Sequence, residues 1–173
     1  MGSRSDARSA YVDALYLLAR RELSERQLRD HLADREHQPD EIDAAVERLR
    51  ADGSLDDARV ARAYARTALK VKGRGRLRIQ RELHQLGIPN DVAAEALAET
   101  FSEVDERALI ARALDKKLRG NSIDSPAAYA RVYQHLMRQG FSPAAVSAAL
   151  RALRKGGGGT TDPAGDADDG RER

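Results

Sequence analysis

Cysteine and tryptophan are both missing from this chain, and its aromatic residues are only five tyrosines and two phenylalanines. Without cysteine there is no disulfide, no thiolate-bound zinc and no cysteine nucleophile. Few aromatic side chains also leave little on which the bases of a single-stranded nucleic acid can stack. The absence of cysteine agrees with a reducing compartment, and we predict a cytoplasmic protein.

Long hydrophobic runs are also missing. No apolar stretch approaches the roughly 20 residues that a membrane-spanning helix requires, and the N-terminal MGSRSDARSAY has no hydrophobic segment typical of a secretion signal. Runs of β-branched residues with period-two alternation are absent too. The apolar content is mainly alanine and leucine, which favour helices. We therefore predict an all-α protein that does not enter a membrane.

Acidic side chains are missing from the 24 residues between Ala58 and Arg81. The formal net charge of +2 hides this asymmetry, because five acids against two arginines give residues 160–173 a charge of −3 and leave +5 on the rest. A long basic run without carboxylates is typical of a surface that faces a polyanion. We predict that the nine cations of this run bind nucleic acid or a protein filament: Arg59, Arg62, Arg66, Lys70, Lys72, Arg74, Arg76, Arg78 and Arg81.

Two helical patterns carry these cations. In the first pattern, a face of apolar residues at helical spacing lies opposite the cations Arg59, Arg62, Arg66 and Lys70. That apolar face consists of Ala61, Tyr64, Ala65, Ala68 and Leu69. After a KGRG loop, Arg74, Arg78 and Arg81 repeat at the spacing of a single exposed stripe, opposite Ile79, Leu83 and Leu86. We expect two basic ridges that flank a basic loop.

The chain repeats a three-helix unit of roughly 45 to 50 residues. The repeat is best seen in the third helix of each unit, and in each case a leucine four residues before the turn into that helix closes the second helix. These leucines are Leu32, Leu83 and Leu136, and the turn residues are Glu36, Gly87 and Gly140. We predict an elongated, curved array divided into a disordered N-terminus (1–9), three repeats (10–53, 54–102 and 103–155) and a disordered, Gly-rich acidic tail (156–173).

Capping residues locate the helix ends. Ser24 with Gln27 forms a capping box, and Ser125 and Ser142 each precede a proline. The predicted helices are Tyr11–Arg21, Ser24–Arg35, Pro39–Asp52, Asp56–Lys70, Gly75–Leu86, Asn90–Phe101, Asp105–Arg119, Pro126–Gln139 and Pro143–Arg154. Because a glutamate resists positive φ, we expect the first repeat to bend differently at Glu36.

No motif of catalysis stands out. The four histidines lie one or two to a repeat, without metal-ligand or triad spacing. The Gly73-Arg74-Gly75 loop lacks the ending of a nucleotide P-loop and follows a helix rather than a strand. Asp56 and Asp57 lie at a helix start, where capping explains them better than metal binding does. We predict no catalytic residue, no metal and no cofactor.

The segment from Leu55 to Ile88 resembles the signature of one bacterial family. Its pieces are Leu-Asp-Asp-Ala-Arg at 55–59 with the continuation from Ala61 to Tyr64, Lys72-Gly73, Arg78-Ile79, Glu82-Leu83 and Gly87-Ile88. Together they resemble the RecX proteins, regulators of the RecA recombinase. The resemblance extends from about Tyr11 to about Leu153.

The resemblance implies a negative regulator of RecA. Such a protein lies along the helical groove of RecA filaments on single-stranded DNA, inhibits their ATPase and strand exchange, and limits filament growth. It thereby modulates recombinational DNA repair and the SOS response. We expect a monomer with the filament as partner and weak direct DNA binding besides. In this reading, reversing Arg62, Arg66 and Arg78 to glutamate weakens filament binding and leaves the melting temperature nearly unchanged.

Two other functions stay open. A free-standing helix-turn-helix-like DNA-binding protein uses similar three-helix units, although the exposed positions offer mostly arginine and few asparagines or glutamines that read bases. A scaffold of helical repeats that binds another protein through alanine-rich grooves is the third hypothesis. Its binding would survive both high salt and loss of the arginines.

Overall fold

The computed structural model describes residues 9–156, and every regular element in that range is an α-helix. The first unit comprises α1 (Ala10–Arg20), α2 (Glu25–Ala33) and α3 (Pro39–Ala51). The second comprises α4 (Asp57–Lys70), α5 (Arg76–Gln85) and α6 (Asn90–Phe101). The third comprises α7 (Glu106–Leu118), α8 (Pro126–Gln139) and α9 (Pro143–Gly156). The predicted tandem three-helix fold is confirmed, and each helix end lies within two residues of its predicted place.

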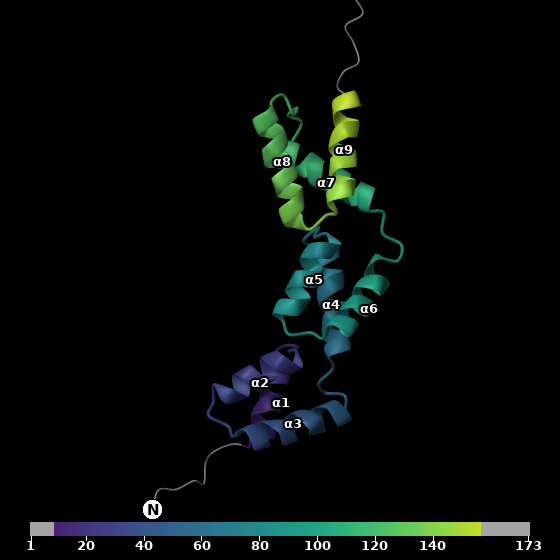
Figure 1. Cartoon of the computed structure of the whole chain (residues 1–173). Coiled ribbons are helices and arrows are strands. Elements are labelled where there is room, and N and C mark those ends of the chain that lie inside the picture. The colour runs from purple at the N-terminus through teal and green to yellow at the C-terminus, as the bar shows by residue number, and fades with distance from the viewer. Residues whose placement is uncertain (1–8, 157–173) are drawn as a thin grey trace, which may run out of the picture.

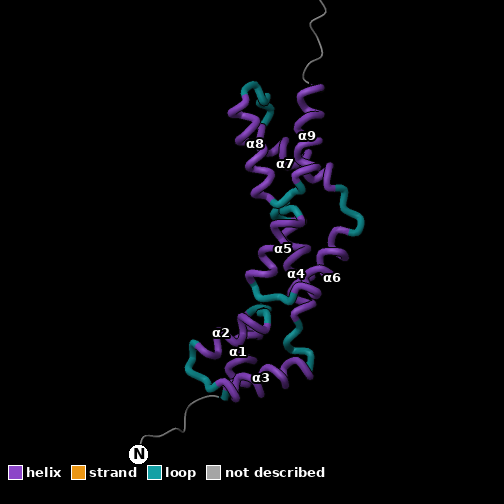
Figure 2. Tube along the Cα trace, viewed as in Figure 1, coloured by secondary structure: helices purple, strands orange, loops and turns teal. Residues whose placement is uncertain are grey.

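The three units follow one another along a gently curved line (Figure 1). The extensive helix contacts lie within units, and short loops connect one unit to the next (Figure 2). Each unit has its own hydrophobic core. The closing leucines Leu32, Leu83 and Leu136 are all 0% exposed. Burial of each such leucine stabilises its unit by roughly 1.5 to 3 kcal/mol.

The predicted helix caps are present. The Ser24 hydroxyl accepts a hydrogen bond from the Gln27 N–H at 3.2 Å, and the Gln27 side chain accepts one from the Ser24 N–H at 3.2 Å. Ser125 caps α8 by accepting from the Ala128 N–H at 3.1 Å. The ends predicted to be disordered lie outside the described residues, apart from Ser9, which caps α1, and Gly156, the last residue of α9. Between residues 9 and 156 no helix is long and apolar enough to cross a membrane.

The joint between the first and second units forms where the start of α2 meets the end of α5. The Ser24 hydroxyl donates to the Leu86 carbonyl, although Ser24 is itself fully buried. The Glu25 N–H donates to the Asp57 carboxylate at 2.8 Å. Both bonds satisfy backbone groups that a helix end leaves without partners.

The joint between the second and third units repeats this arrangement at the other end of α5. The Gly75 N–H donates to the Gln139 carbonyl at 2.8 Å, and the Leu77 N–H donates to the Gly140 carbonyl at 3.0 Å. The free N–H groups at the start of α5 thus meet free carbonyls at the end of α8. The dipoles of the two helices are aligned head to tail, which favours the contact. In consequence α2, α5 and α8 lie end to end (Figure 1).

The expected irregular bend at Glu36 is wrong. Glu36 adopts a φ of +65°, close to the +81° and +89° of Gly87 and Gly140 at the same place in the other units. In each unit the second helix packs against the third, and the turn between them has the same geometry. The first unit accepts a left-handed backbone at a residue with a Cβ, which costs roughly 1 to 2 kcal/mol.

Replacing Glu36 with glycine should therefore stabilise the first unit. The gain should be about 0.5 to 1 kcal/mol, because relief of the left-handed strain exceeds the extra chain entropy that glycine loses on folding. Urea unfolding of the variant and of Glu36→Ala checks this. The alanine variant removes the carboxylate but keeps the Cβ. If the free energy of unfolding rose in both variants, the cause would be the loss of the charge and not the relief of backbone strain.

Candidate nucleic-acid or filament interface

One side of α4 carries the half-buried Arg62 and the exposed Arg66 and Lys70, which we call the α4 stripe. Four-residue spacing places these side chains along one side of the helix. No ion pair within residues 9–156 involves any of them, and the Arg66 Nε only donates to the Arg62 carbonyl at 3.3 Å. Three positive charges on this side are thus left to solvent or to a partner.

The α4 stripe points away from α5. Tyr64 lies on the side of α4 that faces α5, because its hydroxyl donates to the Glu82 carboxylate at 3.0 Å. Arg62 and Arg66 are each two residues from Tyr64, which is about 200° around a helix. The α4 stripe and the cations around Glu82 therefore lie on different faces.

Glu82 binds two of the predicted cations. Its carboxylate accepts from the Arg74 Nη1 at 2.6 Å and from the Arg78 Nε at 3.0 Å. Only 17% of the Arg74 side chain and 33% of the Arg78 side chain are exposed. The sequence predicted that Arg74, Arg78 and Arg81 form one exposed stripe. This prediction is wrong for Arg74 and Arg78, and of the three only Arg81 is exposed. Glu82 directly follows the acid-free run and lies four residues after Arg78. This spacing, which brings opposite charges together on a helix, could have predicted the ion pair from the sequence.

These contacts set the charge states around Glu82. Burial acts to raise the pKa of its carboxyl, but hydrogen bonds from Arg78 and Tyr64 and the charge of Arg74 outweigh burial and lower it. For Tyr64, burial and the neighbouring carboxylate raise the pKa of the phenol. The carboxylate therefore stays ionised at neutral pH and compensates part of the surrounding positive charge. We call Tyr64, Arg74, Arg78 and Glu82 the Glu82 cluster.

Arg59 is also occupied within the chain. Its Nε lies 2.9 Å from the Glu22 carboxylate of the first unit. Its terminal nitrogens donate to the carbonyls of Gly53 and Ser54, both at 3.1 Å. Arg59 thus ties the linker between α3 and α4 to the start of the second unit, a structural role that the charge pattern did not indicate.

The remaining cations make weak intramolecular contacts. The Lys72 ammonium lies 5.9 Å from the centre of the Tyr64 ring, and the Arg76 guanidinium lies 6.0 Å from that of Phe101. The Arg81 Nε donates to the Leu77 carbonyl at 3.4 Å. Six of the nine predicted cations thus make no ion pair within residues 9–156: Arg62, Arg66, Lys70, Lys72, Arg76 and Arg81. Their binding role stays a prediction.

The adjacent carboxylates Asp56 and Asp57 both cap helices. Asp56 accepts from the Arg59 N–H at 3.0 Å at the start of its own helix. Asp57 instead accepts from the Glu25 N–H of α2, and burial raises the pKa of its carboxyl. The described part of the chain contains no cluster of three side chains suited to a metal ion.

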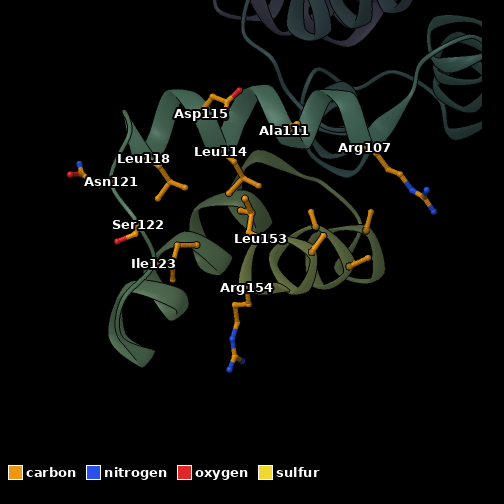
Figure 3. Close-up of a pocket in the computed structure, with 14 residues that line it drawn as sticks. Arg107, Ala111, Leu114, Asp115, Leu118, Asn121, Ser122, Ile123, Leu153 and Arg154 are labelled. Atoms are coloured by element: carbon orange, nitrogen blue, oxygen red, sulfur yellow. The ribbon is translucent and has the colours of Figure 1, made fainter. Parts of the chain in front are cut away.

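A groove of about 1100 Å³ lies on the third unit, between α7, the loop after it and α9. Leu114, Leu118, Ile123 and Leu153 line it together with alanines (Figure 3). A ligand or catalytic site normally contains a few convergent polar groups, and this groove offers mainly methyl groups.

Three family models of known proteins match this chain, one for each three-helix unit. The RecX model described as the first three-helix domain matches residues 10–49. The second and third three-helix domains match residues 56–97 and 105–150. Each match thus falls on one structural unit.

Individual relatives agree with the domain matches. The regulatory protein RecX of Halorhodospira halophila is 38% identical over 140 residues, which are 80% of this chain and 84% of that protein. The chain belongs to the RecX family. The regulatory protein RecX of Geobacillus kaustophilus is 37% identical over 84% of the chain, but the match covers only 54% of that protein. This RecX chain therefore spans about half the length of its Geobacillus relative.

Solved structures show the same fold. The crystal structure of RecX from Lactobacillus salivarius superimposes with a TM-score of 0.71, at 22% identity, over 84% of this chain and 95% of that one. A second crystal structure of regulatory protein RecX gives a TM-score of 0.69 over 82% of this chain and 70% of that one, at 23% identity. The tandem three-helix architecture is thus shared at low sequence identity.

Proposed function

We propose that this RecX protein is a negative regulator of the RecA recombinase that acts by binding and not by catalysis. It binds RecA filaments on single-stranded DNA and inhibits their ATPase, strand exchange and growth. In this way it modulates recombinational DNA repair and the SOS response. Family membership supports the choice of partner, and the α4 stripe is the observation that supports the binding surface.

The α4 stripe is unfavourable for the isolated chain. Like charges four residues apart on a helix destabilise it by about 0.2 to 0.5 kcal/mol per pair. No acid within residues 9–156 forms an ion pair with Arg62, Arg66 or Lys70. A negatively charged partner relieves this repulsion and adds attraction that speeds encounter. The elongated array suits a long groove on a polymer (Figure 1).

Reversing Arg62 and Arg66 to glutamate should strongly weaken inhibition of RecA. Inhibition of RecA ATPase on single-stranded DNA should require at least about tenfold more of the variant, because two attractions become repulsions. Arg66 is exposed, Arg62 is half-buried, and no ion pair within residues 9–156 involves either of them, so helicity and melting temperature should change little. Arg78 is unsuitable for this test because it bonds to Glu82 and to the third unit.

The matched control reverses Arg151 and Arg154, two exposed arginines of α9, and so changes net charge equally. The control should inhibit RecA like the wild type. Equal inhibition by the Arg62 and Arg66 variant would exclude the α4 stripe from the mechanism. No inhibition by the wild type would refute the proposed function, and tight duplex binding without any effect on RecA would support the helix-turn-helix alternative.

A further inference from the structure

The two joints of the array share one side-chain contact. In each joint, an arginine in the first turn of one unit's second helix donates to a carbonyl in the last turn of the next unit's second helix. The Arg26 Nη2 donates to the Gln85 carbonyl at 3.0 Å. The Arg78 Nη1 donates to the Arg138 carbonyl at 3.2 Å. Each accepting residue stands two positions before the glycine at the turn into the third helix, so both joints are built alike.

The turn glycine of each joint leaves room for that arginine. A Cβ added at Gly87 would lie 2.5 Å from the Arg26 Cβ and 2.6 Å from its Cδ, and a Cβ at Gly140 would overlap Arg78. The first unit provides a comparison. Glu36 adopts the same left-handed turn with a side chain, but it lies at the far end of α2, away from the joint (Figure 1). We infer that the neighbouring arginine, and not φ alone, requires glycine at the joints.

Two other contacts of the first joint lie beside the linker between α3 and α4. The Glu25 N–H donates to the Asp57 carboxylate at 2.8 Å, and the Arg59 Nε lies 2.9 Å from the Glu22 carboxylate. Asp57 and Arg59 follow the linker directly, so the covalent chain already keeps this side of the joint together. The arginine contact is different, because it joins α2 to the end of α5 across 59 residues of chain. It therefore restrains the angle between the two units.

No shared apolar contact stiffens the first joint. Within residues 9–156, no apolar residue belongs to or packs against both the first and the second core. Leu109, in contrast, packs against both the second and the third core. Arg26 is exposed and forms no ion pair in the described part of the chain, whereas Arg78 is held by Glu82. A small polar interface permits relative motion of the parts that it joins. The first joint is thus the more adjustable one.

We propose that Arg26, packed against Gly87, is a positioning residue that fixes the angle between the first and second units. This inference rests on the proposed function, because the groove of a filament sets the angle at which neighbouring units can bind it together. Units joined at the matching angle bind one polymer at high effective concentration, and a wrong angle removes this advantage. A freed joint also lowers the fraction of molecules in the binding-competent shape, and the apparent affinity falls by that fraction.

The first test measures the joint by pulsed electron spin resonance. Because the chain contains no cysteine, two introduced cysteines place spin labels at chosen sites. Labels at the exposed Ala44 of α3 and Ala98 of α6 report the distance between the first and second units. Arg26→Ala should broaden the distribution of this distance. Arg20→Ala removes an exposed arginine of α1 and should leave the distribution unchanged. A wild-type distribution in Arg26→Ala would overturn the proposal.

A second pair of variants keeps every charge. Gly87→Ala places a methyl group where the Arg26 side chain lies. Gly120 has a φ of +86°, close to the +81° of Gly87, but its added Cβ would meet no atom within 4 Å. Gly120→Ala therefore has a similar backbone strain and leaves the joints intact. Only Gly87→Ala should broaden the distribution of label distances. Equal distributions in the two glycine variants would overturn the proposal.

Inhibition of RecA ATPase on single-stranded DNA separates this inference from the proposed function. Arg26→Ala and Gly87→Ala should each require about two- to tenfold more protein for equal inhibition, which corresponds to one lost hydrogen bond. Arg20→Ala and Gly120→Ala should inhibit like the wild type.

The combined outcomes are distinct. No inhibition by the wild type would refute the proposed function, while the label distances would still decide whether Arg26 fixes the joint. Normal inhibition despite a broadened joint would refute the positioning role. Weaker inhibition by Arg26→Ala with unchanged label distances would make Arg26 a direct contact of the partner and overturn the proposal.

Discussion

Replacing Gly140 with alanine is expected to lower the free energy of unfolding by about 3 kcal/mol and to separate the third unit from the second. Gly140 has a φ of +89°, which a residue with a Cβ rarely adopts. An added Cβ would also lie 2.3 Å from the backbone nitrogen of Arg78. Backbone strain and steric overlap therefore act together at this joint. Urea unfolding, with hydrogen exchange of α5 and α8, measures both effects.

Two further glycines separate these causes. Gly53 has a φ of +74° and open space around it, so Gly53→Ala should show only the backbone cost of roughly 1 to 2 kcal/mol. Gly75 has an ordinary φ of −76°, but its added Cβ would lie 2.4 Å from the Gly140 carbonyl oxygen. Gly75→Ala should therefore show only the steric cost. Wild-type stability in Gly75→Ala would contradict the close contact of α5 with α8.

Replacing Glu82 with alanine is expected to lower the free energy of unfolding by about 2 to 3 kcal/mol. The carboxylate accepts hydrogen bonds from Tyr64, Arg74 and Arg78, and 16% of its side chain is exposed. Its removal leaves two partly buried guanidinium groups without their counter-charge. Glu82→Gln keeps an acceptor of the same length and should lose only about half as much. Thermal and urea unfolding of both variants measure this difference.

The contribution of Glu82 should also depend on pH. Its folded pKa lies below the ordinary value of 4.5, so its stabilising effect is fully present above that value and is lost as pH falls through the folded pKa. The stability difference between wild type and Glu82→Gln should therefore be constant near neutral pH and shrink in acid. An unchanged difference at pH values well below 4.5 would contradict the lowered pKa.

Local sequence determined the helices and the repeat. The capping box at Ser24, the prolines after Ser125 and Ser142, and apolar residues at helical spacing all act over three or four residues. Interactions of that range form regardless of how distant elements pack. For that reason the fold class and the ends of the helices could be read from the chain.

Tertiary structure decided which cations are free. Arg59 pairs with Glu22 of the first unit, and Arg74 pairs with Glu82, eight residues further along the chain. The helical periodicity of a single segment therefore predicts neither ion pair. Packing likewise turned the α4 stripe away from α5 and imposed a left-handed backbone on Glu36. A periodic pattern gives the direction of a side chain around its own helix, but it does not say which neighbouring element lies in that direction. Charge alone therefore predicted a basic segment, and only the packed structure separated its structural arginines from its open ones.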